Sequence, residues 1–169
     1  MRRDARRILV SFSSGLKIKS RPIESIILLL ENWPKFFPVN VFAYISEEYY
    51  RRLVENLAKA QGITAIQAIL PCFTGIVARA DISLGAAVHT IWERACLLLP
   101  TIFDLQAENQ EEMTNGLSRT GHLILSSINA PHKEISFTTD RLEEMSEASY
   151  GLTDGRGIRK VAAHIMNEY

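Results

Sequence analysis

The chain has 169 residues, 47% of them hydrophobic, and its 19 Lys and Arg residues balance its 19 Asp and Glu residues. This length fits a single domain, residues 1–169, with a substantial core. The neutral charge balance gives no electrostatic reason to expect nucleic acid or an anionic membrane as a partner. No apolar run approaches the roughly 20 residues of a membrane span, and no signal peptide is evident, so we expect a cytoplasmic protein.

Short β-rich runs alternate with helical patterns along the chain. In chain order the sequence predicts a strand at residues 8–12, a helix that opens at Pro22, a strand at 39–45, a helix at 47–59, a strand at 63–70, a short helix at 74–79, a strand at 82–86, a helix at 91–99, a strand at 101–105, a helix at 110–119, a strand at 123–126, and helices at 140–150 and 158–168. This alternation is typical of βαβ units. It predicts an α/β fold with a doubly wound, mainly parallel, six-stranded Rossmann-like sheet covered by helices on both faces.

Local signals refine these elements. Ser46 is a candidate N-cap for the helix at 47–59, and Gly62 follows its end. In the helix at 91–99 the spacing i, i+3, i+4, i+7 places four residues on one face: Trp92, Ala95, Cys96 and Leu99. Asp140, with Glu143 three residues later, resembles a capping box at the start of the next helix.

The two cysteines, Cys72 and Cys96, each lie in apolar surroundings. They predict buried, reduced thiols rather than a framework of disulfides. No close pair of histidines completes a zinc site, so no metal is expected.

The most informative candidate site begins where the strand at 82–86 turns into a helix, because a helix N-terminus after a strand suits an anion. Glu93, one turn into that helix, suits the vicinal hydroxyls of a ribose. It equally completes a capping box with Thr90, and both interpretations stay open. His89 is placed either to donate to a phosphate or to pack as a turn residue beside the cap.

Two other loops follow strands at the same predicted edge of the sheet, where ligands bind in such folds. The amides of Asn109 and Gln110 suit sugar hydroxyls, with the alternative that Asn109 caps the next helix. The serine-rich loop Ser13, Ser14 and Gly15 either offers backbone N–H groups to a phosphate or is a plain loop. No nucleophile is paired with a base, and no phosphate-binding or metalloprotease motif appears, so no catalytic residue is assigned.

Several motifs together resemble a known family. They are the run Asp81-Ile82-Ser83-Leu84-Gly85-Ala86, Thr90, Trp92-Glu93-Arg94, Leu99-Pro100, Asn109-Gln110 and Asp154-Gly155-Arg156-Gly157. They resemble the C-terminal half of the UDP-sugar hydrolase of pseudaminic acid biosynthesis and of related spore-coat polysaccharide biosynthesis proteins, within the GT-B glycosyltransferase group.

The resemblance implies one Rossmann-like half of a GT-B fold that binds UDP or a UDP-sugar and needs no other cofactor. In that family Glu93 matches the ribose ligand, the loop at 86–90 lies against the diphosphate, and Asn109 and Gln110 match amides near the sugar. The hydrolase's catalytic histidine belongs to an N-terminal half that this chain lacks. The implied partners are therefore that half or a second copy across the exposed cleft face.

Both phosphate-facing loops depart from the family pattern. Ala87-Val88-His89 replaces a Gly-Gly-Ser run, and Ser13-Ser14-Gly15-Leu16-Lys17 replaces Gly-Gly-x-Asp-Pro. The lost glycines matter because Cβ atoms obstruct the approach of a diphosphate to the backbone. Two main functions therefore stay open: a UDP-sugar-binding domain for surface-glycan or nonulosonic acid biosynthesis, and a non-catalytic protein-interaction module with eroded phosphate loops. A weaker third alternative is a binder of a different small molecule on the same kind of sheet.

Overall fold

The structure is a computed structural model, and it describes residues 6–11, 39–44, 47–57, 63–67, 73–86, 90–104, 108–121, 123–124 and 138–167. The strands are β1 (Arg7–Ser11), β2 (Val39–Tyr44), β3 (Ile63–Gln67), β4 (Ile82–Ala86), β5 (Thr101–Asp104) and β6 (Leu123–Ile124). The helices are α2 (Glu47–Leu57), α3 (Phe73–Val77), α4 (Thr90–Cys96), the 3₁₀ turn η1 (Glu108–Gln110), α5 (Glu111–Arg119), α7 (Thr139–Tyr150) and α8 (Gly157–Asn167). The helix predicted at Pro22 and the boundary signals at Ser46 and Gly62 lie outside the described residues.

The six strands form one sheet in the order β3-β2-β1-β4-β5-β6, and every described pairing is parallel. From β1 the sheet grows in one direction through β2 and β3 and in the other direction through β4, β5 and β6. The predicted doubly wound Rossmann-like sheet is therefore confirmed. The predicted strand at 82–86 has the bounds of β4, and the residues predicted beyond the ends of the other five strands lie outside the described residues.

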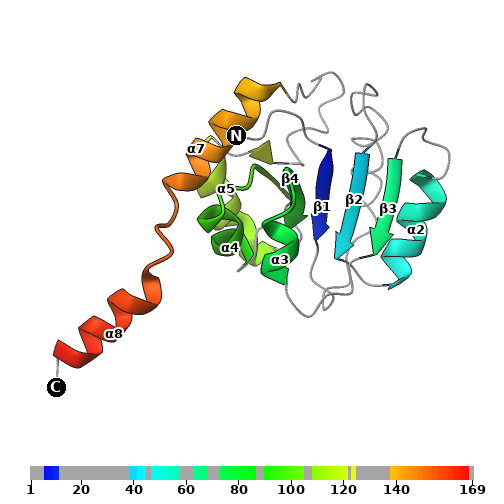
Figure 1. The fold of residues 1–169 in the computed structure, drawn as a ribbon. Helices are drawn as coiled ribbons and strands as arrows, with labels where there is room; N and C mark the ends of the chain where they lie inside the picture. The colour runs from blue at the N-terminus through cyan, green and yellow to red at the C-terminus, as the bar shows by residue number, and fades with distance from the viewer. Residues whose placement is uncertain are drawn as a thin grey trace.

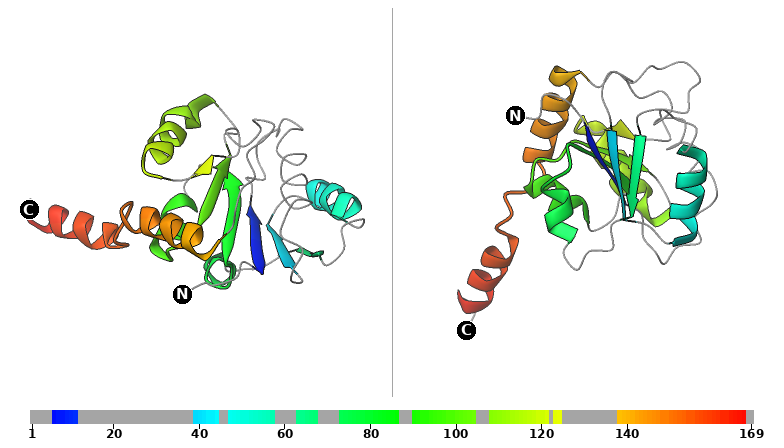
Figure 2. Two further views of the ribbon diagram at one scale, coloured as in Figure 1. Left: turned by 90° about the horizontal axis from the view of Figure 1, so that it is seen from above. Right: turned by 45° about the vertical axis from the view of Figure 1, so that its right-hand side comes forward.

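The central strands are buried on both faces, which explains their continuous apolar runs. Ile8, Leu9 and Val10 of β1 are at most 1% exposed, as are Ile82 and Leu84 of β4. Helices lie on both sides of the sheet: α2 covers one side, and α3, α4 and α7 lie on the other (Figures 1 and 2).

Two clusters of buried side chains join these helices to the sheet. Leu9 of β1 packs with Ile76 and Val77 of α3, together with Ala80 and Leu99. Phe103 of β5 packs with Ile91 of α4 and Leu117 of α5. The second cluster fixes α4 beside the carboxyl end of the sheet, where the candidate site was predicted.

At the other end of the sheet, the Asp81 side chain joins the start of β4 to the start of β1. Its carboxylate is 4% exposed and accepts hydrogen bonds from the backbone N–H of Arg6 (3.1 Å) and of Arg7 (2.9 Å). It also pairs with Nη2 of Arg7 at 2.8 Å, and this hydrogen bond raises the pKa of Arg7. The Asp81 carboxylate therefore holds the starts of the two central strands, β1 and β4, next to each other.

The burial of α4 corrects two predictions. The inward residues are Ile91, Arg94 and Ala95, whereas Trp92 is 46% exposed and Cys96 is exposed. Ala95 and Leu99 are buried as predicted, but the predicted burial of Trp92 and of the Cys96 thiol is wrong; Cys72 lies outside the described residues. The reason is that α4 packs on the protein through Ile91, Arg94 and Ala95, which places Trp92 and Cys96 on its outer side.

The end of α4 is a tight reversal. The N–H groups of Leu98 and Leu99 donate to the carbonyls of Ala95 and Arg94, at 3.0 Å each, while Leu98 takes a φ of 51°. This is the Schellman pattern with leucine in the left-handed position that glycine usually holds. Ser146 of α7 donates to the Leu98 carbonyl at 3.0 Å and so joins the reversal to α7.

The start of α7 also differs from its prediction. Thr138 is the N-cap, and its side chain accepts from the N–H of Arg141 at 3.3 Å. The capping signal assigned to Asp140 is therefore wrong. Asp140 lies in the first turn instead, where a carboxylate interacts favourably with the helix dipole.

The predicted last helix is present as α8, but it leaves the body of the protein after residues 151–156 (Figure 1). None of its residues is buried. Among the described residues, no helix is long and apolar enough to cross a membrane.

Candidate functional site

The carboxyl ends of β1, β4 and β5 meet at one edge of the sheet. Ser11 pairs with Gly85, and Ala86 pairs with Asp104. Helix α4 begins at Thr90, shortly after β4, and η1 begins at Glu108, shortly after β5. Since the chain order of the sheet reverses between β1 and β4, this edge is the topological switch point where open α/β sheets bind ligands.

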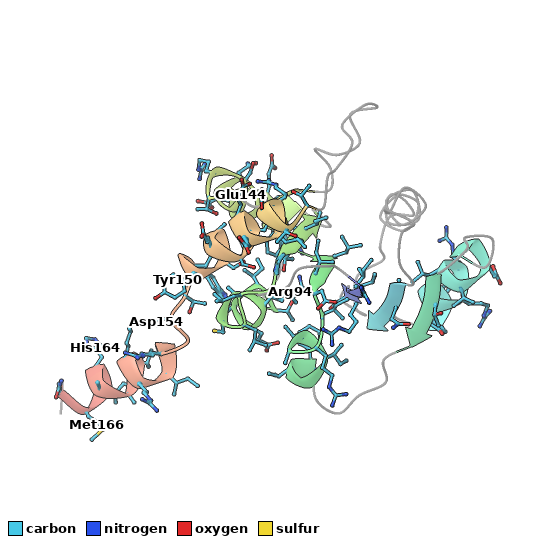
Figure 3. All side chains as sticks on the ribbon, turned by 45° about the horizontal axis from the view of Figure 1, so that its top comes forward. Arg94, Glu144, Tyr150, Asp154, His164 and Met166 are labelled. Atoms are coloured by element: carbon cyan, nitrogen blue, oxygen red, sulfur yellow. The ribbon has the colours of Figure 1, made fainter. Side chains whose placement is uncertain are left out.

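A buried arginine lies at this point. Arg94 extends from α4 toward the strands and is 1% exposed (Figure 3). Within the described part of the chain, its Nε and Nη1 atoms have no hydrogen-bond partner. Burial lowers the pKa of Arg94 to about 10, while the neighbouring Glu93 charge acts in the opposite direction. The guanidinium is therefore still charged at neutral pH, without a described partner for two of its three nitrogens.

Gly85 makes room for this guanidinium. A Cβ added to Gly85 would lie 2.7 Å from Nη2 and 2.9 Å from Nη1 of Arg94, and 2.4 Å from the carbonyl oxygen of Ser11. Only glycine fits between the two neighbours. Arg94 thus lies directly against the last residues of β1 and β4.

Two buried hydroxyl groups near Arg94 also have no hydrogen-bond partner in the described chain. Thr90 lies one helical turn before Arg94 on α4, and Ser83 lies two residues before Gly85 on the same face of β4. In the described chain, the Oγ1 of Thr90 and the Oγ of Ser83 are buried without a hydrogen bond. We call Ser83, Gly85, Thr90 and Arg94 the α4–β4 polar seam. Buried polar atoms almost always have partners, so this concentration makes the α4–β4 polar seam a candidate site for a polar ligand.

Glu93 lies on the outer side of α4 and is exposed. The capping-box interpretation is wrong, because Thr90 is the first helical residue and its hydroxyl accepts no hydrogen bond. The structure leaves the carboxylate of Glu93 accessible at the same helix end as the α4–β4 polar seam. Its match to a ribose ligand stays a prediction.

The two amides after β5 differ in exposure. Asn109 is exposed, whereas Gln110 is 7% exposed and occupies the N-cap position of α5. The interpretation of Asn109 as the cap is therefore wrong. The carbonyl of Gln110 accepts from the Thr114 hydroxyl at 2.7 Å. Of the two predicted sugar ligands, Asn109 is thus the one presented at the surface.

Four predicted site residues lie outside the described residues: His89, Ser13, Ser14 and Gly15. The structure therefore places Thr90, Glu93, Asn109 and Gln110 at the carboxyl edge, two on α4 and two on η1.

The sequence analysis missed the role of Arg94. Its signal was present, since Ile91, Arg94 and Ala95 have the i, i+3, i+4 spacing of an inward helix face. An arginine in the middle of such a face is either paired in the core or directed at a ligand. Because Trp92 and Cys96 are hydrophobic, the prediction placed the buried face on their side of the helix, which is exposed.

Comparison with known proteins finds similar proteins among the solved structures, and these concern the fold. No protein-family model matches the chain, and no curated protein matches it. Among solved structures, the C-terminal CMP-Kdo binding domain of WaaA from Acinetobacter baumannii aligns with a TM-score of 0.55 and 11% identity, over 88% of this chain and 89% of that chain. The N-terminal domain structure of Candida albicans trehalose-6-phosphate phosphatase aligns with a TM-score of 0.50 and 11% identity, over 98% of this chain and 43% of that one.

At this identity the likeness concerns the fold alone. It agrees with the strand order and the helices on both sides of the sheet. The predicted fold class, an α/β fold with a doubly wound, parallel, Rossmann-like sheet, is confirmed.

Proposed function

We propose that this domain binds a nucleotide sugar at the carboxyl edge of its sheet and serves as the donor-binding half of a GT-B glycosyltransferase or UDP-sugar hydrolase. The observation that carries the proposal is the buried Arg94 guanidinium at the switch point between β1 and β4, with two nitrogens unpartnered in the described chain. The likeness to a CMP-Kdo binding domain supports a nucleotide sugar as the ligand class. The sequence resemblance favours UDP as the nucleotide.

The electrostatics favour an anion at this position. An unpaired buried charge is costly, and arginine forms strong charge-assisted hydrogen bonds with phosphate oxygens. A phosphate of the ligand supplies acceptors for Nε and Nη1 and opposes the buried positive charge. The Thr90 hydroxyl, one turn earlier on α4, is a further donor for the same group.

The rest of the ligand follows from the residues around the α4–β4 polar seam. Glu93 is exposed on α4 and accepts two hydrogen bonds from a ribose diol. Asn109 is exposed on η1, which follows the neighbouring strand β5, and suits the sugar. The proposed activity is binding of the donor; the reacting groups come from an N-terminal half, on another chain or in a longer parent.

Calorimetric titration of the domain with UDP, CMP and uridine tests the proposal. Heat with UDP or CMP and a much weaker signal with uridine is the expected result, because the phosphates contact Arg94. A ligand at one hundred times its Kd also stabilises the fold by about 2.7 kcal/mol, which a thermal melt detects. The absence of both heat and thermal shift at millimolar nucleotide would overturn the proposal.

Arg94→Met separates a ligand contact from a structural one. Replacing an unpaired buried charge with an apolar side chain is often neutral or stabilising, so we expect no loss of stability without ligand. Nucleotide affinity should fall at least about tenfold, the effect of about 1.4 kcal/mol. The exposed Arg79→Met is the matched control and should change neither quantity. Equal nucleotide affinity in Arg94→Met and the parent would remove Arg94 from the site.

Glu93→Gln tests the ribose role. The side chain is exposed, so the stability should change by less than about 0.5 kcal/mol. Affinity for UDP should fall, and affinity for the deoxyribose analogue should fall less, because that ligand lacks one of the hydroxyls. Unfolding without any change in affinity would instead identify Glu93 as a structural residue.

A further inference from the structure

Helix α8 carries a continuous apolar face, and none of its residues is buried against the part of the chain that the structure describes. Ile158, Val161 and Ile165 are 87%, 60% and 53% exposed, and Met166 is 79% exposed. Together with Ala162 they occupy positions i, i+3, i+4, i+7 and i+8, which form one continuous stripe. An isolated helix of this length is marginal in water, so its stability depends on something that covers the stripe.

The segment before α8 directs the helix away from its own domain. Gly155 takes a φ of 69° and lies against Cys96, whose Sγ would be 3.3 Å from an added Cβ. Asp154 accepts from the N–H of Arg156 at 2.9 Å and pairs with Lys160 at 2.9 Å. The Asp154 contacts stabilise the first turn of α8, which extends away from the body of the protein (Figure 3).

The domain carries a second apolar surface where α8 departs. Trp92, Leu98 and Tyr150 are 46%, 42% and 74% exposed, and Cys96 is exposed beside Gly155. Trp92 and Cys96 are one turn apart on α4, and Leu98 is joined to α7 through Ser146, one turn before Tyr150. We call Trp92, Cys96, Leu98 and Tyr150 the α4–α7 patch. Since α8 extends away from it, the patch is open to the same helix of another molecule.

The charges on the two elements are complementary. Helix α8 carries Arg159 and Lys160 and no acidic residue, whereas α7 carries Asp140, Glu143, Glu144 and Glu147 against the single base Arg141. Glu144 and Glu147 are exposed on α7. A basic amphipathic helix also suits an anionic membrane surface, but the acidic α7 beside it would be repelled there. On another copy, the α4–α7 patch would cover the apolar stripe. Lys160 already pairs with Asp154, and Glu144 with Arg141, so the charge attraction would come from Arg159 of α8 and Glu147 of α7.

We propose that two copies of this chain exchange their α8 helices, each placing the stripe of Ile158, Val161 and Ile165 on the α4–α7 patch of the other. Such an exchange is isologous, because each copy gives the same helix and receives it on the same patch. It is independent of nucleotide binding and does not use the carboxyl edge of the sheet.

The mass of the full chain in solution, measured by sedimentation over a wide concentration range, tests the exchange. The parent should be a dimer, and the double variant Val161→Asp with Ile165→Asp should weaken the dimer at least about a hundredfold. The matched control is Ala163→Asp with Asn167→Asp, which adds the same two charges on the polar side of α8 and should dimerise with a smaller change. Because no residue of α8 is buried, the melting of the sheet should be the same in the diluted double variant and the diluted parent.

Mixing distinguishes exchange onto the patch from other pairings. The double variant keeps an intact patch, and a Trp92→Asp, Tyr150→Asp chain keeps an intact helix. Each should be monomeric alone, and an equal mixture should recover a weaker dimer with one of its two contacts intact. A dimer that survives the patch substitutions would overturn the exchange. So would a parent that is monomeric throughout, including one that sediments with phosphatidylglycerol vesicles through the α8 stripe.

Discussion

The guanidinium of Arg94 lies so close to Gly85 that no Cβ fits between them: an added Cβ would lie 2.7 Å from Nη2. This contact joins α4 to the last residues of β4 and places a buried charge at the switch point of the sheet. The absence of a Cβ at Gly85 thus leaves the space that the charged Arg94 guanidinium occupies.

Gly85→Ala should be among the most destabilising single-methyl changes in the chain. The new Cβ would lie 2.4 Å from the Ser11 carbonyl, which belongs to the neighbouring strand and cannot rotate away. We expect a loss of about 2 to 3 kcal/mol in the free energy of unfolding, measured by urea denaturation. A loss below about 0.5 kcal/mol would mean that β1 and β4 are less tightly paired than the structure indicates.

Gly116→Ala is the opposite case and serves as the control. Gly116 lies within α5, and an added Cβ would approach only the Arg119 side chain, at 4.0 Å. Alanine is favoured over glycine inside a helix, so the free energy of unfolding should rise by about 0.5 to 1 kcal/mol. The same denaturation measurement decides this, and a destabilised variant would contradict the helical assignment of residue 116.

Replacing Asp81 should lower the free energy of unfolding more than replacing its partner Arg7. Asp81→Ala removes the acceptor of two backbone N–H groups and of the Arg7 side chain, and should cost about 3 kcal/mol. Arg7→Ala leaves the backbone bonds in place and removes a side chain that is 49% exposed, so about 1 kcal/mol is expected. Thermal or urea unfolding of both variants gives the order, and equal losses would show that the backbone bonds contribute little.

The first turn of α8 should respond to acid. Hydrogen bonds from Lys160 and the Arg156 N–H lower the pKa of Asp154 below its ordinary value of 3.8. The stabilising contact is therefore complete above that ordinary value and is lost as the pH falls through the lowered pKa. Carbon chemical shifts of Ala162 and Ala163 should report loss of helix over that acidic range. Asp154→Asn should remove the transition, and an unchanged transition would assign it to another group.

The fold was largely predictable because its sheet is buried on both faces. Runs such as Ile8 to Val10 are apolar without alternation, and loops separate them from helical patterns, so the parallel order followed from the chain. The ends of elements were less predictable. At the end of α4, Leu98 takes the left-handed conformation that glycine usually adopts, so the sequence contains no glycine to predict the reversal. The N-cap of α7 is Thr138, two residues before the expected Asp140.

The site was predictable in position and only partly in its residues. Thr90, Glu93, Asn109 and Gln110 do follow strands β4 and β5 at one edge. Which of them is exposed depends on tertiary packing: Gln110 is buried by the start of α5, and Arg94 is turned inward because the space above Gly85 accepts it. The isolation of α8 could not be predicted, since an amphipathic pattern is the same whether the apolar face meets its own domain or another molecule.

The parallel centre of the sheet also determines when this chain is able to fold. β1 needs β4 as a neighbour, and its first residues bond to Asp81 across 74 and 75 residues of sequence. On a ribosome, β1, β2 and β3 emerge before that partner exists, and one edge of β1 stays unpaired until β4 follows. Late closure of long-range parallel pairs makes folding slow and exposes an apolar edge meanwhile. We therefore expect C-terminal truncations before Asp81 to aggregate, and the full chain to benefit from chaperones that shield β1.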